Sequence, residues 1–465
     1  MDAKSVAAAA LQLERHLTQG TAQLGSVVER NDIRSAKAPF RAMPSYTVIY
    51  PKVVVQALFE LYREYNECFR SLITQNREWD TDYQFCFDES GNPVNRWVQI
   101  DMVGLPDSFL SLAAGFSVQE VKEALRHFIF EVENSLAMYQ LLERVTPSTG
   151  FRDVFRASLT DLRVKHGMPI ALLAVTEDKY RALCAEELGL SPEEMPTDEL
   201  VRELTGFDRL FHPEQFRKHV ADNGGHSGYL LYVRSSDPTQ KLSNPDRVTI
   251  QHPLLSDPEM RRTIRSCALT ININDPDEKN PERLINDTKA YMPHMRMGWR
   301  LRSIEDLYAP SCLEAIRSGK MKIEDFGREA LHPGLHDYLV DCGVDPLAVV
   351  RGQRRLRVKP LQGTYGCYGH KQIQFNKGKH RRDLGDMMRK WGHFVLQPEL
   401  PIPHLVDPAT GQTYGYIDRN FVTQREDGSY GFMLGFRSML PLESDEAGRG
   451  RYHGNEQTVW AAVEG

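Results

Sequence analysis

Residues 356–370 are the most informative segment of the chain, and they read Leu356-Arg357-Val358-Lys359-Pro360-Leu361-Gln362-Gly363-Thr364-Tyr365-Gly366-Cys367-Tyr368-Gly369-His370. An apolar strand leads through Lys359 into a loop with three spaced glycines. Glycine lets the backbone approach a phosphate closely, and lysine supplies a point charge for the same group. The spacing matches neither a P-loop nor a Rossmann fingerprint. A lysine before a glycine-rich hairpin is also typical of an ordinary turn, so this motif alone leaves both interpretations open.

Three further segments follow in an order that suits a nucleotide site. Residues 394–400 are a short apolar strand that ends near the carboxylate of Glu399, and backbone groups with one acidic side chain can read the adenine edge. The alternating strand 414–423 carries Arg419, and the return strand 431–440 carries Arg437. We therefore expect two arginines beside the nucleotide.

This order of parts, closed by Asn455, resembles the ATP-grasp superfamily of carboxylate–amine ligases. In ordinary members a Glu-x-Asn metal strand comes last, whereas here the similar element is a hairpin of residues 83–93 and 96–108, near the other end of the chain. That placement resembles glutathionylspermidine-synthetase-like and circularly permuted ATP-grasp proteins. Residues 285–293, Ile-Asn-Asp-Thr-Lys-Ala-Tyr-Met-Pro, are similar to the Asn-Lys-Ala…Leu-Pro stretch of the same group.

The metal motif departs from the pattern of the family, because Gln99-x-Asp101 stands where Glu-x-Asn is expected. Magnesium requires hard oxygen donors and usually keeps several waters, so one carboxylate with amide and phosphate oxygens would suffice. Asp82 or Asp88 is an alternative contributor. In a second interpretation, Gln99 and Asp101 merely border a strand and a turn.

The resemblance implies an α/β (α+β) protein with permuted parts, in which ATP lies between two antiparallel-sheet subdomains beside a small α/β domain. It also implies ATP and Mg²⁺ as cofactors and assigns roles to matching positions. These are Lys359, Gly363, Tyr365, Gly366 and Gly369 for the phosphates, Gln397, Glu399 and Leu400 for adenine, Arg419 and Arg437 for catalysis, and Gln99, Asp101 and Asn455 for the metal.

The implied activity is that of an ADP-forming C–N ligase, which forms an amide or peptide bond through an acyl phosphate. The expected substrates are a small carboxylate and an amine, as in the joining of two amino acids or small peptides or the formation of a γ-glutamyl amide. A catalytically inactive ATP-binding or regulatory protein is the alternative, because the metal motif is altered. Homodimerisation remains open.

The composition restricts the classes of partner and the cellular compartment that we expect. Lys and Arg number 57 against 63 Asp and Glu, so the net charge of −6 argues against nucleic acid, despite basic clusters around the glycine loop. The seven cysteines show no Cys-x-x-Cys spacing, which predicts a reduced, cytoplasmic protein without structural zinc. The alanine run 7–10 is too short for a signal peptide or membrane span.

The sequence divides into segments of different pattern. We expect a helix with a connection in 1–40, a lobe with helices and the metal hairpin in 41–149, a small α/β domain in 150–270, a helical connection in 271–350 and the nucleotide-binding region in 351–465.

Several individual elements can also be predicted. Apolar spacing predicts a helix from Pro51 into the seventies, and a Ser117 capping box predicts a second helix through Leu142. Buried strands are expected at 169–175 and 228–233. His332 and His336 are interpreted as loop histidines, since a proline and a glycine between them would break a helix.

Overall fold

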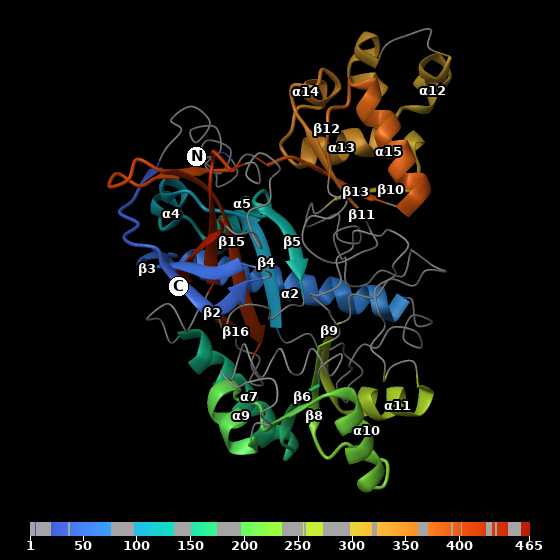
Figure 1. Ribbon diagram of the computed structural model, residues 1–465. Helices are drawn as coiled ribbons and strands as arrows, with labels where there is room; N and C mark the ends of the chain where they lie inside the picture. Colours follow the sequence, from blue (N-terminus) through green and yellow to red (C-terminus); the bar gives the residue numbers. More distant parts are fainter. Residues whose placement is uncertain are drawn as a thin grey trace.

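The computed structural model describes Ser5 and residues 20–35, 38–75, 97–133, 150–173, 197–234, 254, 257–272, 298–318, 323–360, 371–391, 394–400, 402–424, 430–432, 435–444 and 457–465. Within these ranges, helices and strands of three separate sheets succeed one another, so the protein is of the mixed α/β class. Figure 1 shows the sheets in three regions of the molecule.

The largest sheet, here called the central sheet, joins the two ends of the chain. It has ten strands in the order β1-β14-β15-β17-β18-β3-β2, with β4 and β16 also paired to β15, and β5 paired to β4. Among the described strand pairs of this sheet, only β1–β14 and β3–β18 are parallel. The strands are β1 (Gly20–Thr21), β2 (Val28–Ser35), β3 (Ala38–Ile49), β4 (Trp97–Val103), β5 (Ile129–Glu133), β14 (His404–Val406), β15 (Thr413–Gln424), β16 (Tyr430–Phe432), β17 (Gly435–Pro441) and β18 (Val459–Glu464).

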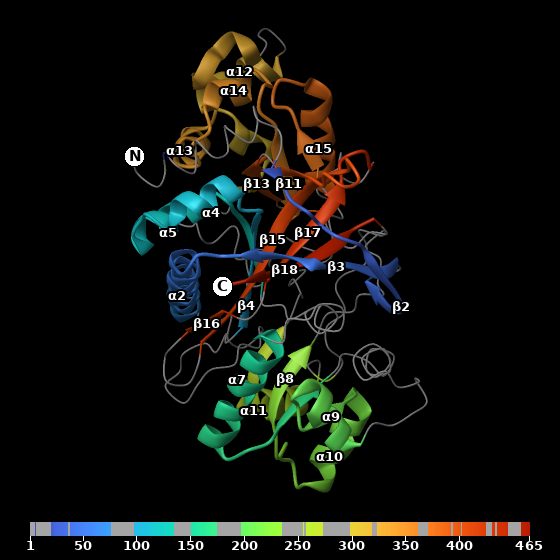
Figure 2. The same ribbon diagram turned by 90° about the vertical axis from the view of Figure 1, so that its left-hand side faces the viewer.

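Three helices pack on one face of the central sheet (Figure 2): α2 (Lys52–Gln75), α4 (Asp107–Ala113) and α5 (Val118–Leu125). The helical spacing that predicted α2 is confirmed, because Leu58 and Tyr62 from its apolar stripe are buried in this core. From the sheet, Ile100 and Met102 point into the same cluster. The sheet thus has one apolar, helix-covered face, and strand alternation places Gln99 and Asp101 on the other.

A second sheet is entirely antiparallel and has the order β10-β13-β11-β12. Its apolar face, with Val358 and Leu396, is buried against the surrounding helices. In Figure 1 this lobe lies at the upper right. Its elements are β10 (Trp299–Leu301), η5 (Ile304–Leu307), α12 (Pro310–Arg317), η6 (Ile323–Ala330), α13 (Pro333–Asp341), α14 (Pro346–Val350), β11 (Leu356–Pro360), β12 (Lys371–Ile373), α15 (Gly378–Trp391) and β13 (Phe394–Pro398).

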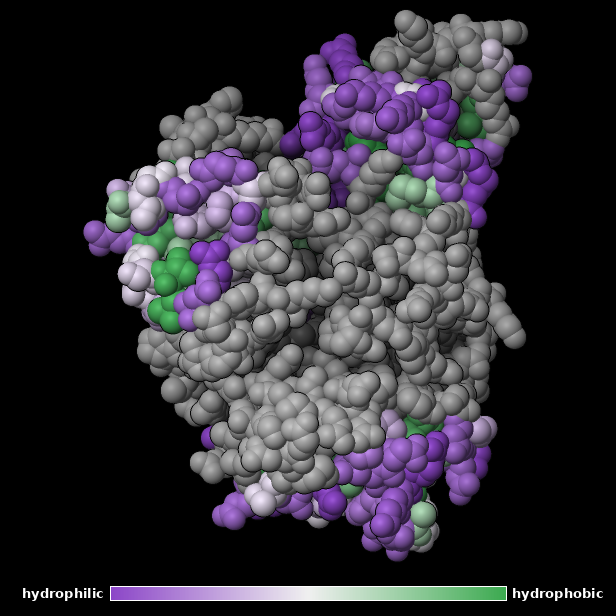
Figure 3. All heavy atoms as spheres, viewed as in Figure 1, coloured by the Kyte–Doolittle hydropathy of each residue, from purple (hydrophilic) through white to green (hydrophobic). Residues whose placement is uncertain are grey.

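The third sheet is parallel, with the order β7-β6-β8-β9, and lies at the bottom of Figure 1. All its described elements fall inside the segment 150–270 expected to form a small α/β domain, except that β9 extends two residues beyond it. They are α7 (Gly150–His166), β6 (Ile170–Leu173), α9 (Asp198–Thr205), β7 (Arg209–Phe211), α10 (Pro213–Asp222), β8 (Leu230–Arg234), α11 (Pro258–Cys267) and β9 (Ala268–Asn272). In Figure 3 the described surfaces of this unit and of the second-sheet lobe are mainly hydrophilic, with small hydrophobic patches.

One expected helix is wrong where the structure describes it. The helix after Ser117 has the predicted capping box, but α5 ends at Leu125 and the chain turns into β5. The alternating residues of β5 pair with β4, so tertiary pairing overrides the helical pattern expected through Leu142. Within the first forty residues, Ser5 is helical, and β1, β2 and the start of β3 form strands from Gly20 onward, where the connection continues; the other positions before Gly20 lie outside the described residues.

The interpretation of His336 as a loop residue is also wrong. Pro333 occupies the first position of α13, where proline has no intrahelical donor to lose, and the helix continues through His336. His332 caps the helix by accepting a hydrogen bond from the Gly334 N–H at its Nδ1, at 3.2 Å. Among the helices in the described ranges, none is long and apolar enough to cross a membrane.

Candidate functional site

The face of the central sheet opposite its described helices carries a buried polar cluster, here called the polar sheet face: Gln99, Asp101 and Arg419. The antiparallel register of β4 and β15 sets Asp101 opposite Arg419 and Gln99 opposite Phe421. Directly opposed residues in an antiparallel pair project from the same face. Two segments more than three hundred residues apart in the sequence thus contribute to one cluster, as expected from the permuted order of parts.

Gln99 and Arg419 both contact the side chain of Asp101. Gln99 Nε2 donates to Asp101 Oδ1 at 2.7 Å, and Arg419 Nη2 lies 3.2 Å from Asp101 Oδ2. All three residues are buried. The Nε of Arg419 has no hydrogen-bond partner among the described residues, and the guanidinium carbon lies 6.0 Å from the ring centre of Phe436. A buried guanidinium with an unused donor is suited to an anionic ligand, because buried donors are normally satisfied.

Arg437 lies on the opposite, helix-covered face. The register sets it beside Asp418, and its Nε and Nη2 lie 2.7 and 2.9 Å from the two carboxylate oxygens. It also donates to the Leu105 carbonyl oxygen, at 2.9 Å from Nη2, and to the Tyr46 hydroxyl, at 3.2 Å from Nη1, and its guanidinium carbon lies 4.0 Å from the ring centre of Tyr416. Tyr50 donates its hydroxyl to Asp418 Oδ2 at 2.7 Å. Desolvation alone would lower the pKa of Arg437, but the adjacent carboxylate holds it well above its ordinary value.

Strand alternation therefore separates the two arginines that the sequence analysis placed together. Arg419 opposes Phe436, whereas Arg437 opposes Asp418, so the two guanidinium groups leave the sheet on opposite sides. Arg437 is 0% exposed and directs its three nitrogens to protein groups. This arrangement gives Arg437 a role in holding the sheet, and we do not assign it to contact with a substrate.

The predicted adenine segment links the second sheet to the central sheet. Gln397 opposes Arg357 in the β11–β13 pair, away from the apolar face, and its Nε2 donates to the Phe130 carbonyl oxygen of β5 at 3.1 Å. Leu400 packs against the core of the central sheet. The segment 397–400 thus passes from one sheet to the other.

Glu399 does not present a free carboxylate. Its Oε1 accepts from Arg357 Nη2 at 3.1 Å and from Gln372 Nε2, and its backbone N–H donates to the Arg355 carbonyl oxygen at 3.0 Å. The described contacts thus hold the Glu399 side chain on the rim of the second sheet.

Other predicted positions are only partly described. The structure gives Lys359 as a backbone position in β11, opposite Val395. Gly363, Tyr365, Gly366, Gly369 and Asn455 lie outside the described residues, as do segment 285–293 and Asp82 and Asp88.

The oxygen donors of the polar sheet face match magnesium in kind. Asp101 supplies a carboxylate and Gln99 an amide, and such hard oxygen ligands are those that Mg²⁺ prefers. A cation there would compete with Arg419 for the carboxylate, which predicts modest affinity. No group of three His, Cys, Asp or Glu side chains in the described part of the chain could hold a metal.

Sequence reasoning missed the Asp418–Arg437 network and a cluster of Asp208 with two arginines in the third-sheet unit. The alternation of residues along strand 414–423 already predicts that the Asp418 and Arg419 side chains project from opposite faces of the sheet. The partner of Asp418, however, depends on the register of β15 with β17, which the intervening hairpin sets.

A comparison of the chain with models of known protein families found no match, and a comparison with curated proteins found none either.

Proposed function

We propose that the protein is an ATP-dependent carboxylate–amine ligase of the permuted ATP-grasp type. The observation that carries the proposal is the pairing of Asp101 with Arg419 across β4 and β15. The sequence motifs required these distant residues to share one site, and the sheet register is consistent with that requirement. In the proposal the substrates are amino acids or small peptides.

The nucleotide, in this proposal, lies between the second sheet and the central sheet. Two observations support the placement: Gln397 and Leu400 both reach the central sheet, and the polar sheet face is the side of that sheet without described helices. Lys359 and the glycine loop would contact the phosphates, and the segment 397–400 would contact adenine. A lysine and backbone N–H groups together suit a triphosphate, because they combine charge with directed donors.

ATP with magnesium supplies the phosphoryl group and neutralises charge in this chemistry. Arg419 would orient and stabilise the transferring group, since a planar guanidinium bridges paired oxygens. Asp101 and Gln99 would hold the cation, and Asp101 would also fix the orientation of Arg419. The substrate carboxylate becomes an acyl phosphate, ADP leaves, and the amine displaces phosphate.

A second candidate is an ATP-binding protein without turnover. The observation that favours it is the state of Asp101, whose two oxygens contact the Gln99 amide and the Arg419 guanidinium. A carboxylate held in this way binds a cation less readily than a free one, and catalysis would suffer before nucleotide binding.

One experiment separates the two candidates. The full chain is incubated with magnesium, ATP and a pool of amino acids while released phosphate is recorded, and ATP affinity is measured by calorimetry. The ligase predicts phosphate release that requires the pool and is lost in Arg419→Ala but kept in Arg389→Ala, a control at a well-exposed arginine. ATP binding without release favours the second candidate. Absence of both contradicts the ATP-grasp assignment.

A further inference from the structure

A pocket in the third-sheet unit lies apart from the proposed site. It has a volume of about 390 Å³ and is lined by Arg163, Gly167, Met168, Pro169, Arg202 and Asp208. The lining comes from the end of α7, the turn before β6, helix α9 and the residue before β7, so the pocket opens at the amino ends of the parallel strands. Its size falls within the range of small-molecule sites.

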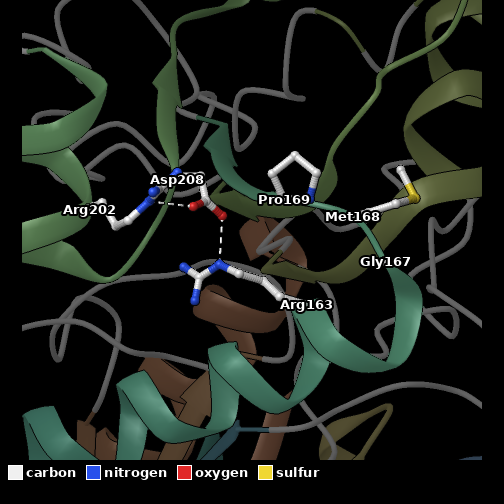
Figure 4. A pocket seen from close by; sticks show the side chains of 6 residues that line it. All are labelled: Arg163, Gly167, Met168, Pro169, Arg202 and Asp208. Atoms are coloured by element: carbon white, nitrogen blue, oxygen red, sulfur yellow. Dashed lines mark hydrogen bonds and ion pairs between the residues drawn. The ribbon is translucent and has the colours of Figure 1, made fainter.

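The pocket carries a surplus of one positive charge. Figure 4 shows the guanidinium groups of Arg163 and Arg202 approaching the buried Asp208 from two sides. Their Nε atoms lie 2.7 and 2.8 Å from its two oxygens, and the Ile170 N–H donates to the same carboxylate at 2.8 Å. One carboxylate therefore balances only one of the two arginines.

The remaining donors of the two arginines differ. Arg163 directs its Nη2 to the Gly206 carbonyl oxygen and its Nη1 to Thr160, at 3.5 Å. Arg202 uses only Nε within the described residues, and its side chain is 64% exposed. Its two terminal nitrogens are thus the donors open to a ligand, held in place by the bond from Nε to Asp208.

We propose that this pocket binds a small monocarboxylate with an apolar body. The terminal nitrogens of Arg202 would hold the carboxylate, because a guanidinium fork matches its two oxygens. Met168 and Pro169 give an apolar wall for the body of the ligand. The single negative charge of such a ligand matches the one surplus positive charge of the pocket. Inorganic phosphate, in contrast, would make no contact with the apolar wall. The inference is independent of the proposed ligase activity.

Ligand-observed NMR titration of the full chain with benzoate tests the proposal, with benzamide as the neutral counterpart of similar shape. We expect saturable benzoate binding and at least about tenfold weaker binding of benzamide and of inorganic phosphate, from the loss of a charge-assisted contact or of the apolar contact. Arg202→Ala should weaken benzoate binding by at least about tenfold. Arg217→Ala, which removes the same charge from an exposed position on α10, should leave it unchanged.

A second variant tests the apolar wall. Met168→Trp fills the pocket but keeps both arginines, so benzoate binding should again fall, with an unchanged unfolding temperature as evidence of folding. The absence of saturable benzoate binding to the wild type at millimolar concentration would overturn the proposal. Equal affinity of the wild type and Arg202→Ala, or phosphate binding as tight as benzoate binding, would do the same.

Discussion

Arg437 and Asp418 form a two-point ion pair near one end of the β15–β17 strand pair, with both side chains 0% exposed. The pair also contacts the Leu105 backbone and the hydroxyls of Tyr46 and Tyr50. It thereby fixes the C-terminal strands to the N-terminal part of the central sheet. The same strand, one residue further along, presents Arg419 to the other face.

Breaking this pair should destabilise the fold strongly. Arg437→Ala leaves the buried Asp418 carboxylate without its counter-ion, and we expect the free energy of unfolding to fall by about 3–5 kcal/mol. Arg389→Ala removes an arginine that is 75% exposed and should change it by less than about 0.5 kcal/mol. Urea unfolding followed by circular dichroism measures both. Equal midpoints for the two variants would show that the pair contributes little.

The Asp208 cluster predicts a pH-dependent contribution to stability. Burial would raise the pKa of Asp208, but hydrogen bonds from Arg163 and the Ile170 N–H, with the nearby Arg202, hold it below its ordinary value. A lowered folded-state pKa gives stability that is present above the unfolded pKa of about 3.9 and is lost as the pH falls below it.

Thermal unfolding of Asp208→Asn and the wild type measures this contribution. The difference in unfolding temperature should be largest near neutral pH and should shrink as the pH falls below about 4, because the Asp208 carboxylate takes up a proton first in the unfolded chain and, at lower pH, in the folded protein. Asp198→Asn, at a side chain that is 59% exposed, is the control and should have little effect at any pH. A difference that persists unchanged at low pH would mean that the charge of Asp208 is not responsible.

Local sequence patterns predicted several elements, because the spacing of apolar residues along the sequence matches the repeat of the helix or strand that they form. The stripe that includes Leu58 and Tyr62 predicted α2, a short apolar run predicted β13, and strand alternation predicted β15 at nearly the observed bounds. The helix expected through Leu142 failed because β5 gains its pairing from β4, a partner that local pattern does not contain. The prediction that His336 lies in a loop failed for a different reason. Proline breaks the interior of a helix but is tolerated at its first position, which Pro333 occupies in α13.

The site was predictable only in part for a related reason. The motifs assigned Asp101 and Arg419 to one site, and these two residues oppose each other on neighbouring strands. They did not indicate that the Arg437 side chain projects from the helix-covered face of the sheet. The face from which a side chain projects depends on the strand register, and the motifs do not say which face the helices cover. The buried aromatic and ionic partners of Arg437 come from segments whose proximity only the folded chain defines.

Nucleotide binding should depend on Lys359. We expect Lys359→Ala to weaken ATP binding by roughly 10- to 100-fold, since a charge-assisted hydrogen bond contributes about 1.5–3 kcal/mol. Lys379→Ala, at an exposed position on α15, is the charge-matched control. Calorimetry with folded variants distinguishes them. An unchanged affinity in Lys359→Ala would remove this residue from the nucleotide site.

The polar sheet face should respond differently to two conservative changes. Asp101→Asn keeps an oxygen ligand but loses the charge, so turnover should fall and excess magnesium should partly restore it. Arg419→Lys keeps the charge but loses the planar fork, so turnover should fall with little restoration by metal. Magnesium titrations of phosphate release compare them, with the exposed Asp107→Asn as control. Identical magnesium responses of the two variants would separate Asp101 from the metal.

The fate of the carboxylate oxygen tests the proposed chemistry of the whole site. The full chain is incubated with magnesium, ATP and a pool of amino acids labelled with ¹⁸O in their carboxylates, and the nucleotides, phosphate and new amides are analysed by mass spectrometry. An acyl phosphate transfers one carboxylate oxygen to the released phosphate, so the account predicts ADP and ¹⁸O-labelled phosphate in equal amounts with a new amide product. Label in AMP, or unlabelled phosphate without an amide product, would contradict it.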